Sequence, residues 1–186
     1  MKQLIPKFGT ACLQTRGDAF GTLARSVVGQ QISAKAAQKV WDRFSQLSRQ
    51  ITPSQVLNFK IEDMRTAGLS ARKVEYLIDL AVHFDSGALH VDHWVSMDDE
   101  AIIDELVTIR GVGRWTAEMF LIFYLLRPNV LPLDDIGLIT GISQCYFSGE
   151  KVSRSDAREV ALAWTPYRTV ATWYIWRSLD PVPVEY

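Results

Sequence analysis

Two short segments hold residue types that could bind a phosphate group and supply a catalytic acid. Residues 110–114 read Arg-Gly-Val-Gly-Arg before an amphipathic stretch, and Asp134 and Asp135 follow that stretch within Leu-Pro-Leu-Asp-Asp at 131–135. Glycines permit a hairpin too tight for side chains, and a helix beginning there exposes amide groups that favour an anion. Together the segments indicate that protein backbone amides bind a sugar-phosphate chain, with a catalytic carboxylate beside them.

The elements around these segments are able to bring them together. Apolar residues recur at helical spacing over 101–109 and 114–126, which predicts two helices. The second helix rises about 1.5 Å per residue and carries the chain roughly 20 Å away from the hairpin. Pro128 and Pro132 then favour an extended segment that can cover up to about 23 Å. We therefore expect the two aspartates to return to the hairpin end of the helix.

Each segment also has a simpler interpretation. A Gly-Val-Gly between helices is commonly only a turn, and an aspartate before Ile-Gly-Leu-Ile is commonly only a helix N-cap. A dinucleotide-binding loop is excluded, because a helix rather than a strand precedes the turn and the third glycine is missing. The order and spacing of the two segments favour the functional interpretation.

The rest of the chain also has a helical pattern, and no sustained alternation indicates a strand. The predicted helices are 19–29, 34–47, 53–58, 61–66, 72–84, 98–109, 114–126, 135–146, 154–164 and 166–178. The predicted N-caps are Ser33, Thr52, Ser70 and Ser153. The least regular stretch, 86–97, is predicted to connect the two halves of a single helical domain that spans residues 1–186.

Composition limits the classes of protein that remain. The chain has 186 residues, 48% of them hydrophobic, but no apolar run of membrane-spanning length and no hydrophobic leader, so we expect a cytoplasmic protein. We also expect it to be a monomer. Cys12 and Cys145 are too few for a disulfide framework, and the three histidines lack cysteine partners for a metal site. The net charge of −1 and pI near 6.3 argue against a broad basic surface, so any binding of nucleic acid should depend on few phosphate contacts.

The chain resembles the helix-hairpin-helix glycosylase superfamily, and within it the DNA-3-methyladenine glycosylase II (AlkA-like) branch. Four segments carry the resemblance in the family's order: residues 20–33, the hairpin, residues 131–135, and residues 164–176. The similarity extends from about Asp18 to Trp176. It implies an all-α fold with two helical lobes around a cleft and without the N-terminal mixed α/β domain of larger relatives.

The resemblance also implies an activity on double-stranded DNA that contains alkylated bases. The enzyme would rotate a cationic purine out of the duplex and hydrolyse its N-glycosidic bond, which starts base excision repair. The resemblance places the catalytic carboxylate at Asp135 and leaves Asp134 as a cap or orienting group. Trp115 and Trp176 would form aromatic walls that suit a positively charged base, with Met119 and Tyr174 beside them. Arg168 would help to hold this pocket.

The implied DNA contacts fall on three parts of the chain. Gln31, with Gln30 beside it, occupies the position of the residue that fills the gap left by the rotated base. The other implied contacts are Arg110, Gly111, Gly113, Arg114 and Thr116 at the hairpin, and Ser70, Arg72 and Lys73 after the turn at 68–70.

Two departures from related branches narrow the expected chemistry. Relatives that also cut the DNA backbone have a Schiff-base lysine where this chain has Trp115, so no lyase activity is expected. Two cysteines cannot supply the four ligands of an iron-sulfur cluster, and we expect no cofactor beyond a Na or K ion that the hairpin carbonyls of Ile109 and Gly111 could hold. A glycosylase for another damaged or mismatched base and a non-catalytic DNA-binding module remain alternatives, and 3-methyladenine, 7-methylguanine and 1-methyladenine remain open as substrates.

Overall fold

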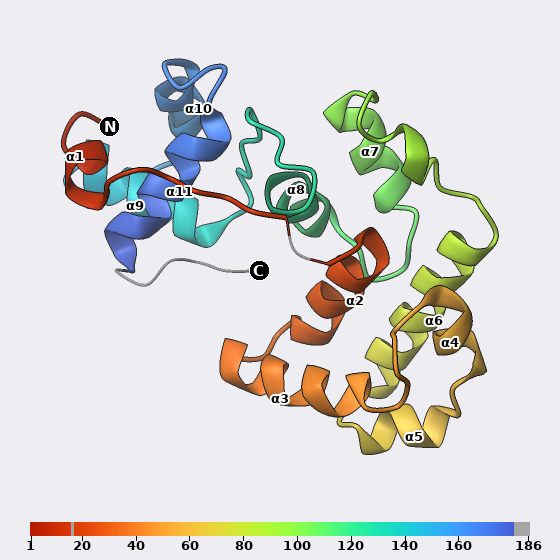
Figure 1. Cartoon of the computed structure of the whole chain (residues 1–186). Coiled ribbons are helices and arrows are strands. Elements are labelled where there is room, and N and C mark those ends of the chain that lie inside the picture. Colours follow the sequence, from red (N-terminus) through yellow and green to blue (C-terminus); the bar gives the residue numbers. More distant parts are fainter. Residues whose placement is uncertain (16, 181–186) are drawn as a thin grey trace. The chain divides into compact units, whose positions relative to one another are not determined.

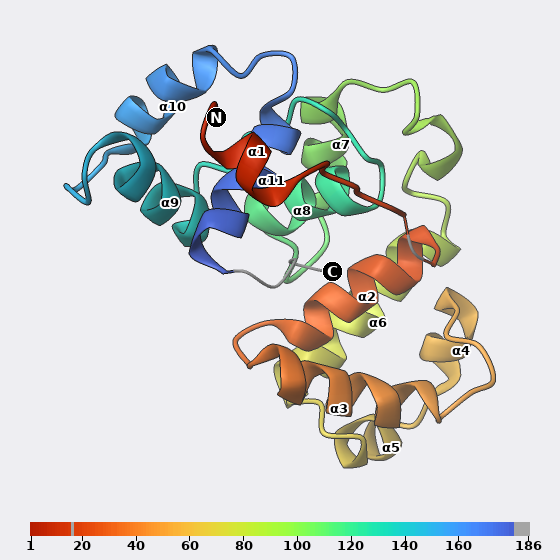
Figure 2. The same ribbon diagram turned by 60° about the vertical axis from the view of Figure 1, so that its left-hand side comes forward.

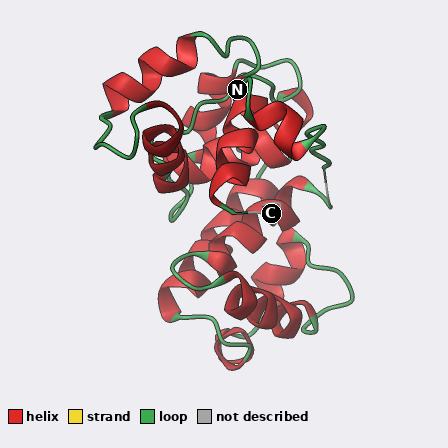
Figure 3. Ribbon diagram, turned by 90° about the vertical axis from the view of Figure 1, so that its left-hand side faces the viewer, coloured by secondary structure: helices red, strands yellow, loops and turns green. Residues whose placement is uncertain are grey.

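The computed structural model describes residues 1–15 and 17–180, and within them every regular element is a helix (Figure 3). The all-α prediction is therefore confirmed. No helix in this part of the chain combines the length and apolar character needed to span a membrane. The helices are α1 Leu4–Phe8, α2 Ala19–Gly29, α3 Ala34–Ser45, α4 Pro53–Asn58, α5 Ile61–Thr66, α6 Ala71–Asp85, η1 Val91–His93 (a 3-10 turn), α7 Asp99–Leu106, α8 Arg114–Phe123, α9 Ile136–Tyr146, α10 Arg154–Leu162 and α11 Arg168–Leu179.

Side-chain caps account for where several helices begin. The four predicted N-caps, Ser33, Thr52, Ser70 and Ser153, each accept a hydrogen bond from an amide in the first turn of the helix that follows. Ser153 also forms a reciprocal capping box with Asp156. Because a capping oxygen satisfies an amide that has no partner within its helix, these residues fix the helix starts more firmly than apolar periodicity does.

All ten predicted helices are present, with differences mainly at their C-terminal ends. The predicted helix 98–109 ends at Leu106 and continues as a tight turn, and the predicted helix 114–126 ends at Phe123. Leu126 has a left-handed φ of 54°, and the amide of Arg127 donates to the carbonyl of Leu121. The chain turns back there although its apolar pattern continues. The short helices α1 and η1 were not predicted.

The chain divides into two compact units. Unit 1 consists of residues 1–15 and 121–186, described to residue 180, and unit 2 consists of residues 16–120. The boundaries differ from the prediction: the stretch 86–97 lies inside unit 2, and one boundary falls within α8. A boundary inside a continuous helix leaves no loop-like composition that a sequence pattern could detect.

Unit 1 is built on the packing of α9 against α11, which run beside each other in Figure 1. Gly141 permits this close approach, because a Cβ at that position would lie 2.3 Å from Cγ2 of Ile175. The helix α1 packs against α11, where the Tyr174 hydroxyl donates to the carbonyl of Gly9 at 2.6 Å. The buried core of this unit comprises Leu138, Ile142, Val152, Ala157, Ala161, Trp164, Ala171 and Ile175.

Unit 2 is organised around α6, the longest helix, which packs against α2, α4 and α5 (Figure 2). Phe20 and Phe84 meet edge to face with ring centroids 5.4 Å apart, and Phe84 in turn contacts Trp94 at 6.1 Å. Trp94 also contacts Phe120 at 5.3 Å. Through these ring contacts, α2, α6, η1 and α8 share one core.

Candidate active site

Asp135 is the N-cap of α9, and its carboxylate is held by two hydrogen bonds. Its Oδ1 accepts from the amide of Leu138 at 2.6 Å and from the indole Nε1 of Trp176 at 2.8 Å. The first bond comes from the first turn of its own helix and the second from α11, which packs against α9. Two donors on one oxygen fix the plane of the carboxylate at a helix N-terminus, where negative charge is favoured.

Small residues make this arrangement possible. A Cβ at Gly137 would lie 3.1 Å from Oδ1 of Asp135 and 3.3 Å from Cδ1 of Trp176. Any side chain at 137 would therefore press on both members of the hydrogen-bonded pair. Gly137 and Gly141 lie one helical turn apart on the same face of α9. This face packs against α11, and it leaves room for the Trp176 indole to reach Asp135.

Asp134 occupies a different environment, although it is adjacent in sequence. Its side chain is 46% exposed, and its Oδ1 lies 2.6 Å from the Arg154 guanidinium. It is not the N-cap of α9. The structure therefore distinguishes a carboxylate fixed by two buried partners from one that forms a surface ion pair.

The aromatic residues predicted for a base pocket are distributed over both units. In unit 1, Trp176 is 7% exposed and stacks on Phe123 with centroids 5.9 Å apart and an interplanar angle of 12°. Tyr174 is also buried, and its hydroxyl is bonded to Gly9. In unit 2, Met119 is buried and Trp115 is half-buried. The roles of these side chains as walls of a pocket stay predictions.

In the hairpin of unit 2, the two glycines differ in conformation and surroundings. Gly111 has a φ of 86°, and a Cβ there would lie 2.2 Å from the Tyr76 ring, so only glycine fits. Gly113 does not have a positive φ, but it is exposed and a Cβ there would meet nothing within 4 Å. The backbone at the start of α8 is thus open to a close approach from outside.

The two arginines of the hairpin are engaged with carboxylates of unit 2. Arg110 pairs with Glu75 at 3.3 Å. Arg114 forms two bonds with Glu100 and one with Glu118, and its hydrogen bond with Glu100 raises the pKa of Arg114 and lowers the pKa of Glu100. Much of the positive charge at the hairpin is therefore balanced within the protein. Thr116, another predicted contact, is buried.

The other predicted DNA contacts of unit 2 lie at the ends of α2 and α6. Ser70 caps α6 and is exposed, as is Arg72. Lys73 instead points inward: its Nζ donates to the carbonyl of Val28 at 2.7 Å, and burial lowers the pKa of its amine. Gln31 is exposed with a left-handed φ of 60°.

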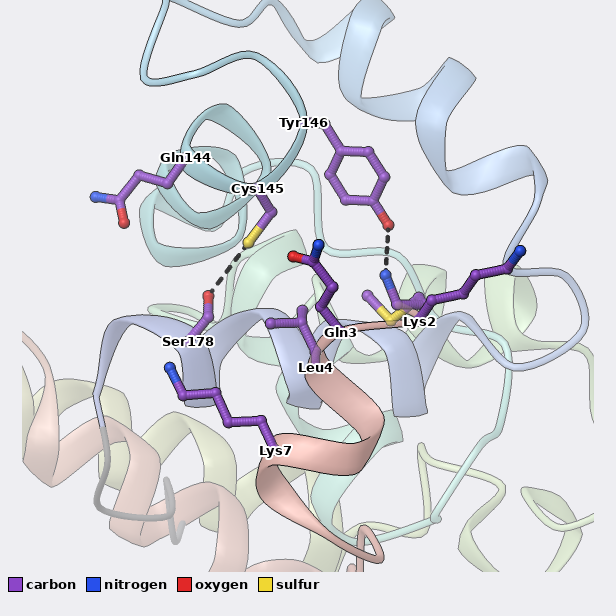
Figure 4. A pocket seen from close by; sticks show the side chains of 9 residues that line it. Lys2, Gln3, Leu4, Lys7, Gln144, Cys145, Tyr146 and Ser178 are labelled. Carbon is purple, nitrogen blue, oxygen red and sulfur yellow. Dashed lines mark hydrogen bonds between the residues drawn. The ribbon is translucent and has the colours of Figure 1, made fainter.

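A hollow of about 610 Å³ lies elsewhere in unit 1, between α1, α9 and α11 (Figure 4). Lys2, Lys7, Tyr146 and the Cys145–Ser178 pair are among the residues that line it, with Sγ and Oγ 3.5 Å apart. None of the predicted site residues borders this hollow, so we do not assign it to the site.

Sequence reasoning missed Gly137, which lies beside Asp135 in unit 1, and Tyr76 and Asp79, which contact the hairpin in unit 2. Asp79 accepts a hydrogen bond from the amide of Arg110 at 2.8 Å and so holds the hairpin from α6. The Gly-x-x-x-Gly spacing of 137 and 141 was visible in the sequence and could have indicated close helix packing. No sequence pattern predicts that α6 contacts the hairpin.

Comparisons with known proteins identify relatives of this chain. Residues 24–166 match the family model of the HhH-GPD superfamily base excision DNA repair proteins. The DNA-3-methyladenine glycosylase 1 of Schizosaccharomyces pombe is 32% identical over 165 residues, which cover 87% of this chain and 72% of that protein. The chain spans 72% of the length of this relative and 57% of the length of a second curated relative, the DNA-3-methyladenine glycosylase of Bacillus subtilis.

Solved structures agree with the family match. A DNA-3-methyladenine glycosidase from Bacillus halodurans has a TM-score of 0.89 at 36% identity, with 96% of this chain and 83% of that chain covered. The S. pombe 3-methyladenine DNA glycosylase in complex with abasic DNA has a TM-score of 0.87 at 30% identity, with coverage of 100% and 93%. The sequence resemblance is thereby confirmed at the level of family and fold.

Proposed function

Since the chain belongs to the HhH-GPD superfamily of base excision DNA repair proteins, we propose that it is a DNA glycosylase that releases alkylated purines, such as 3-methyladenine, from duplex DNA. The observation that carries the proposal is the carboxylate of Asp135, which a helix amide and the Trp176 indole hold in a fixed orientation. Relatives named as 3-methyladenine glycosylases, one of them bound to abasic DNA, support this assignment.

The proposed reaction needs one carboxylate because the substrate already has a good leaving group. Methylation at N3 or N7 leaves the purine positively charged. When the bond from C1′ to N9 breaks, its electron pair neutralises the base, which departs without a protonating acid. Asp135 stabilises the positive charge that develops on the sugar. A water molecule then adds to C1′, and its proton passes to Asp135 and on to solvent.

The proposed DNA contacts combine backbone and side-chain groups. The open backbone at Gly113 and the first turn of α8 would hold a phosphate, with Ser70 and Arg72 as a second contact. Gln31 would enter the duplex where the base has left. We propose that the protein is cytoplasmic, associated with the nucleoid if its source is a bacterium, and that it acts as a monomer.

We propose that the enzyme does not cleave the DNA backbone and needs no cofactor. Trp115 offers no amine for a Schiff base, and two cysteines cannot hold an iron-sulfur cluster. The carbonyls of Ile109 and Gly111 accept hydrogen bonds from Val112 and Gln30, and each retains a second lone pair that could face a Na or K ion. Borohydride trapping of a covalent DNA adduct would contradict the monofunctional assignment.

The decisive experiment compares Asp135→Asn with Asp134→Asn. Asparagine is as good an N-cap as aspartate and keeps an oxygen for the Trp176 indole, so Asp135→Asn should fold normally while base release falls by at least roughly a hundredfold. Asp134→Asn removes only an exposed ion pair and should change stability by less than about 1 kcal/mol, with the rate nearly unchanged.

The measurement is chromatography of bases released from methylated duplex DNA. If the Asp134 variant is the inactive one, the assignment of the acid is wrong. If the unmodified chain binds duplex DNA but releases no base, it is a binding module. If it releases only a different lesion from a panel of damaged duplexes, the substrate class is wrong.

A further inference from the structure

The side chain of Gln30 reaches from the end of one helix to the hairpin. Gln30 is the C-cap residue of α2, and its Nε2 donates to the carbonyl oxygen of Gly111 at 2.8 Å. The two residues are 81 positions apart in sequence, and the bond is partly buried. Because its amide nitrogen is directed at the hairpin carbonyl in a partly buried position, this side chain is poorly placed to contact DNA itself.

The adjacent residue in the same loop is the exposed one. Gln31 has a φ of 60°, which is uncommon for a residue with a side chain and is retained only where surrounding contacts impose it. The contacts on either side are the Lys73 bond to Val28, the Gln30 bond to Gly111, and the Ser33 cap of α3. The strained and exposed side chain thus stands directly after the residue that is tied to the hairpin.

The hairpin is itself supported by α6. The amide of Arg110 donates to Oδ2 of Asp79, and Gly111 packs against the ring of Tyr76. Lys73, on the same helix, holds the end of α2. The helix α6 therefore supports both the loop 29–33 and the hairpin 110–113, and Gln30 supplies the direct bond between them.

We infer that Gln30 is a positioning residue, which keeps the exposed Gln31 at a fixed spacing from the hairpin backbone. The inference rests on the proposed function, because base rotation needs one group to hold the strand while another fills the gap. Rotation out of the stack is unfavourable by a few kcal/mol. If the two groups could move apart, part of the binding energy would no longer favour the rotated state.

The test uses Gln30→Met, which keeps the length of the side chain and removes the donor. Gln55→Met is the matched control, because Gln55 is an exposed glutamine on α4 in the same unit. A single side-chain to backbone bond shifts an equilibrium by about fivefold. We therefore expect Gln30→Met to lower the single-turnover rate of base release at saturating enzyme by about five- to tenfold, with affinity for undamaged duplex unchanged.

A second readout reports, without chemistry, on how the bound protein changes base stacking beside the gap. With 2-aminopurine next to an abasic-site analogue, Gln30→Met should reduce the fluorescence increase on binding, while Gln55→Met should not. A third readout needs no DNA: hydrogen exchange of the Val112 amide, which is bonded to the Ile109 carbonyl, should become faster in Gln30→Met only.

The outcomes separate this inference from the proposed function. If the unmodified chain releases no methylated base, the function fails, and the Val112 exchange rate still decides whether Gln30 fixes the hairpin. A Gln30→Met variant whose release rate, fluorescence signal and Val112 exchange all match those of Gln55→Met overturns the inference. The inference is also overturned if Gln30→Met loses affinity for undamaged duplex by the same factor as it loses release rate. That result would show that the hairpin had lost its own structure.

Discussion

Replacing Trp176 with phenylalanine tests whether the indole acts through the acid. Phenylalanine keeps an aromatic ring to stack on Phe123 but lacks the Nε1 group that donates to Oδ1 of Asp135 at 2.8 Å. Hydrogen bonds to charged groups contribute about 1.5–3 kcal/mol. If this hydrogen bond stabilises the transition state by its full contribution, the rate of base release in Trp176→Phe should fall by about 10- to 150-fold.

The matched control is Trp173→Phe. Trp173 lies on the same helix and is also 7% exposed, but its ring contacts Tyr174 and the Arg177 guanidinium. Both substitutions remove a similar buried area, which should lower the free energy of unfolding by about 1–2 kcal/mol in each variant, and Trp176→Phe also loses the hydrogen bond to Asp135. Only the substitution at 176 should slow base release.

The assay is single-turnover release of methylated purines, with thermal unfolding of each variant measured in parallel. A double mutant with Asp135→Asn decides the mechanism: if Trp176 acts through the acid, Trp176→Phe should have little further effect once the acid is gone. Equal rates for the two tryptophan variants, or a full additional loss in the double mutant, would refute the reasoning.

Three further results are expected. Gly141→Ala should lower the free energy of unfolding by about 1–3 kcal/mol, measured by denaturant titration, because its Cβ would lie 2.3 Å from Cγ2 of Ile175; an unchanged midpoint would contradict this packing. Burial raises the pKa of Glu105, but hydrogen bonds from Trp94 and His90 outweigh it and the net pKa is lowered. The stability from this carboxylate is therefore present above the ordinary glutamate range and lost as pH falls through the lowered pKa, so Glu105→Gln should reduce stability at neutral pH by about 1–2 kcal/mol and flatten its acid dependence. DNA binding should weaken only gradually with salt, with a log-log slope no steeper than about −3, because the proposed contacts involve few phosphates; a steep slope would show a larger cationic surface.

The parts of the fold that could be predicted from sequence are those with local causes. Helix starts followed from capping residues, because a cap and the amide it serves are a few residues apart. Several helix ends did not follow: residues 124–126 continue an apolar pattern, yet α8 ends at Phe123. The short helix α1 has no side-chain cap and packs against α11, a contact that no local pattern contains.

The same limit applies to the site. The sequence could indicate an acid near 134–135, because turn residues before a helix are recognisable, but two adjacent aspartates are equivalent until the helix start is fixed. The structure separates them by their partners, Arg154 for Asp134 and Trp176 for Asp135. The support of the hairpin by Asp79 and Gln30 joins residues far apart in sequence, and spacing carries no signal for it.

The way Asp135 is held favours an electrostatic role over a purely basic one. Its Oδ1 receives hydrogen bonds from the Leu138 amide and the Trp176 indole, and it lies at the N-terminus of α9. These interactions fix the position and orientation of the carboxylate, which is what stabilisation of a cationic sugar requires. Because an alkylated purine leaves as a neutral base, proton transfer from water can follow bond cleavage. An acid that caps a helix can therefore serve this substrate class, whereas a neutral damaged base would also need a proton donor.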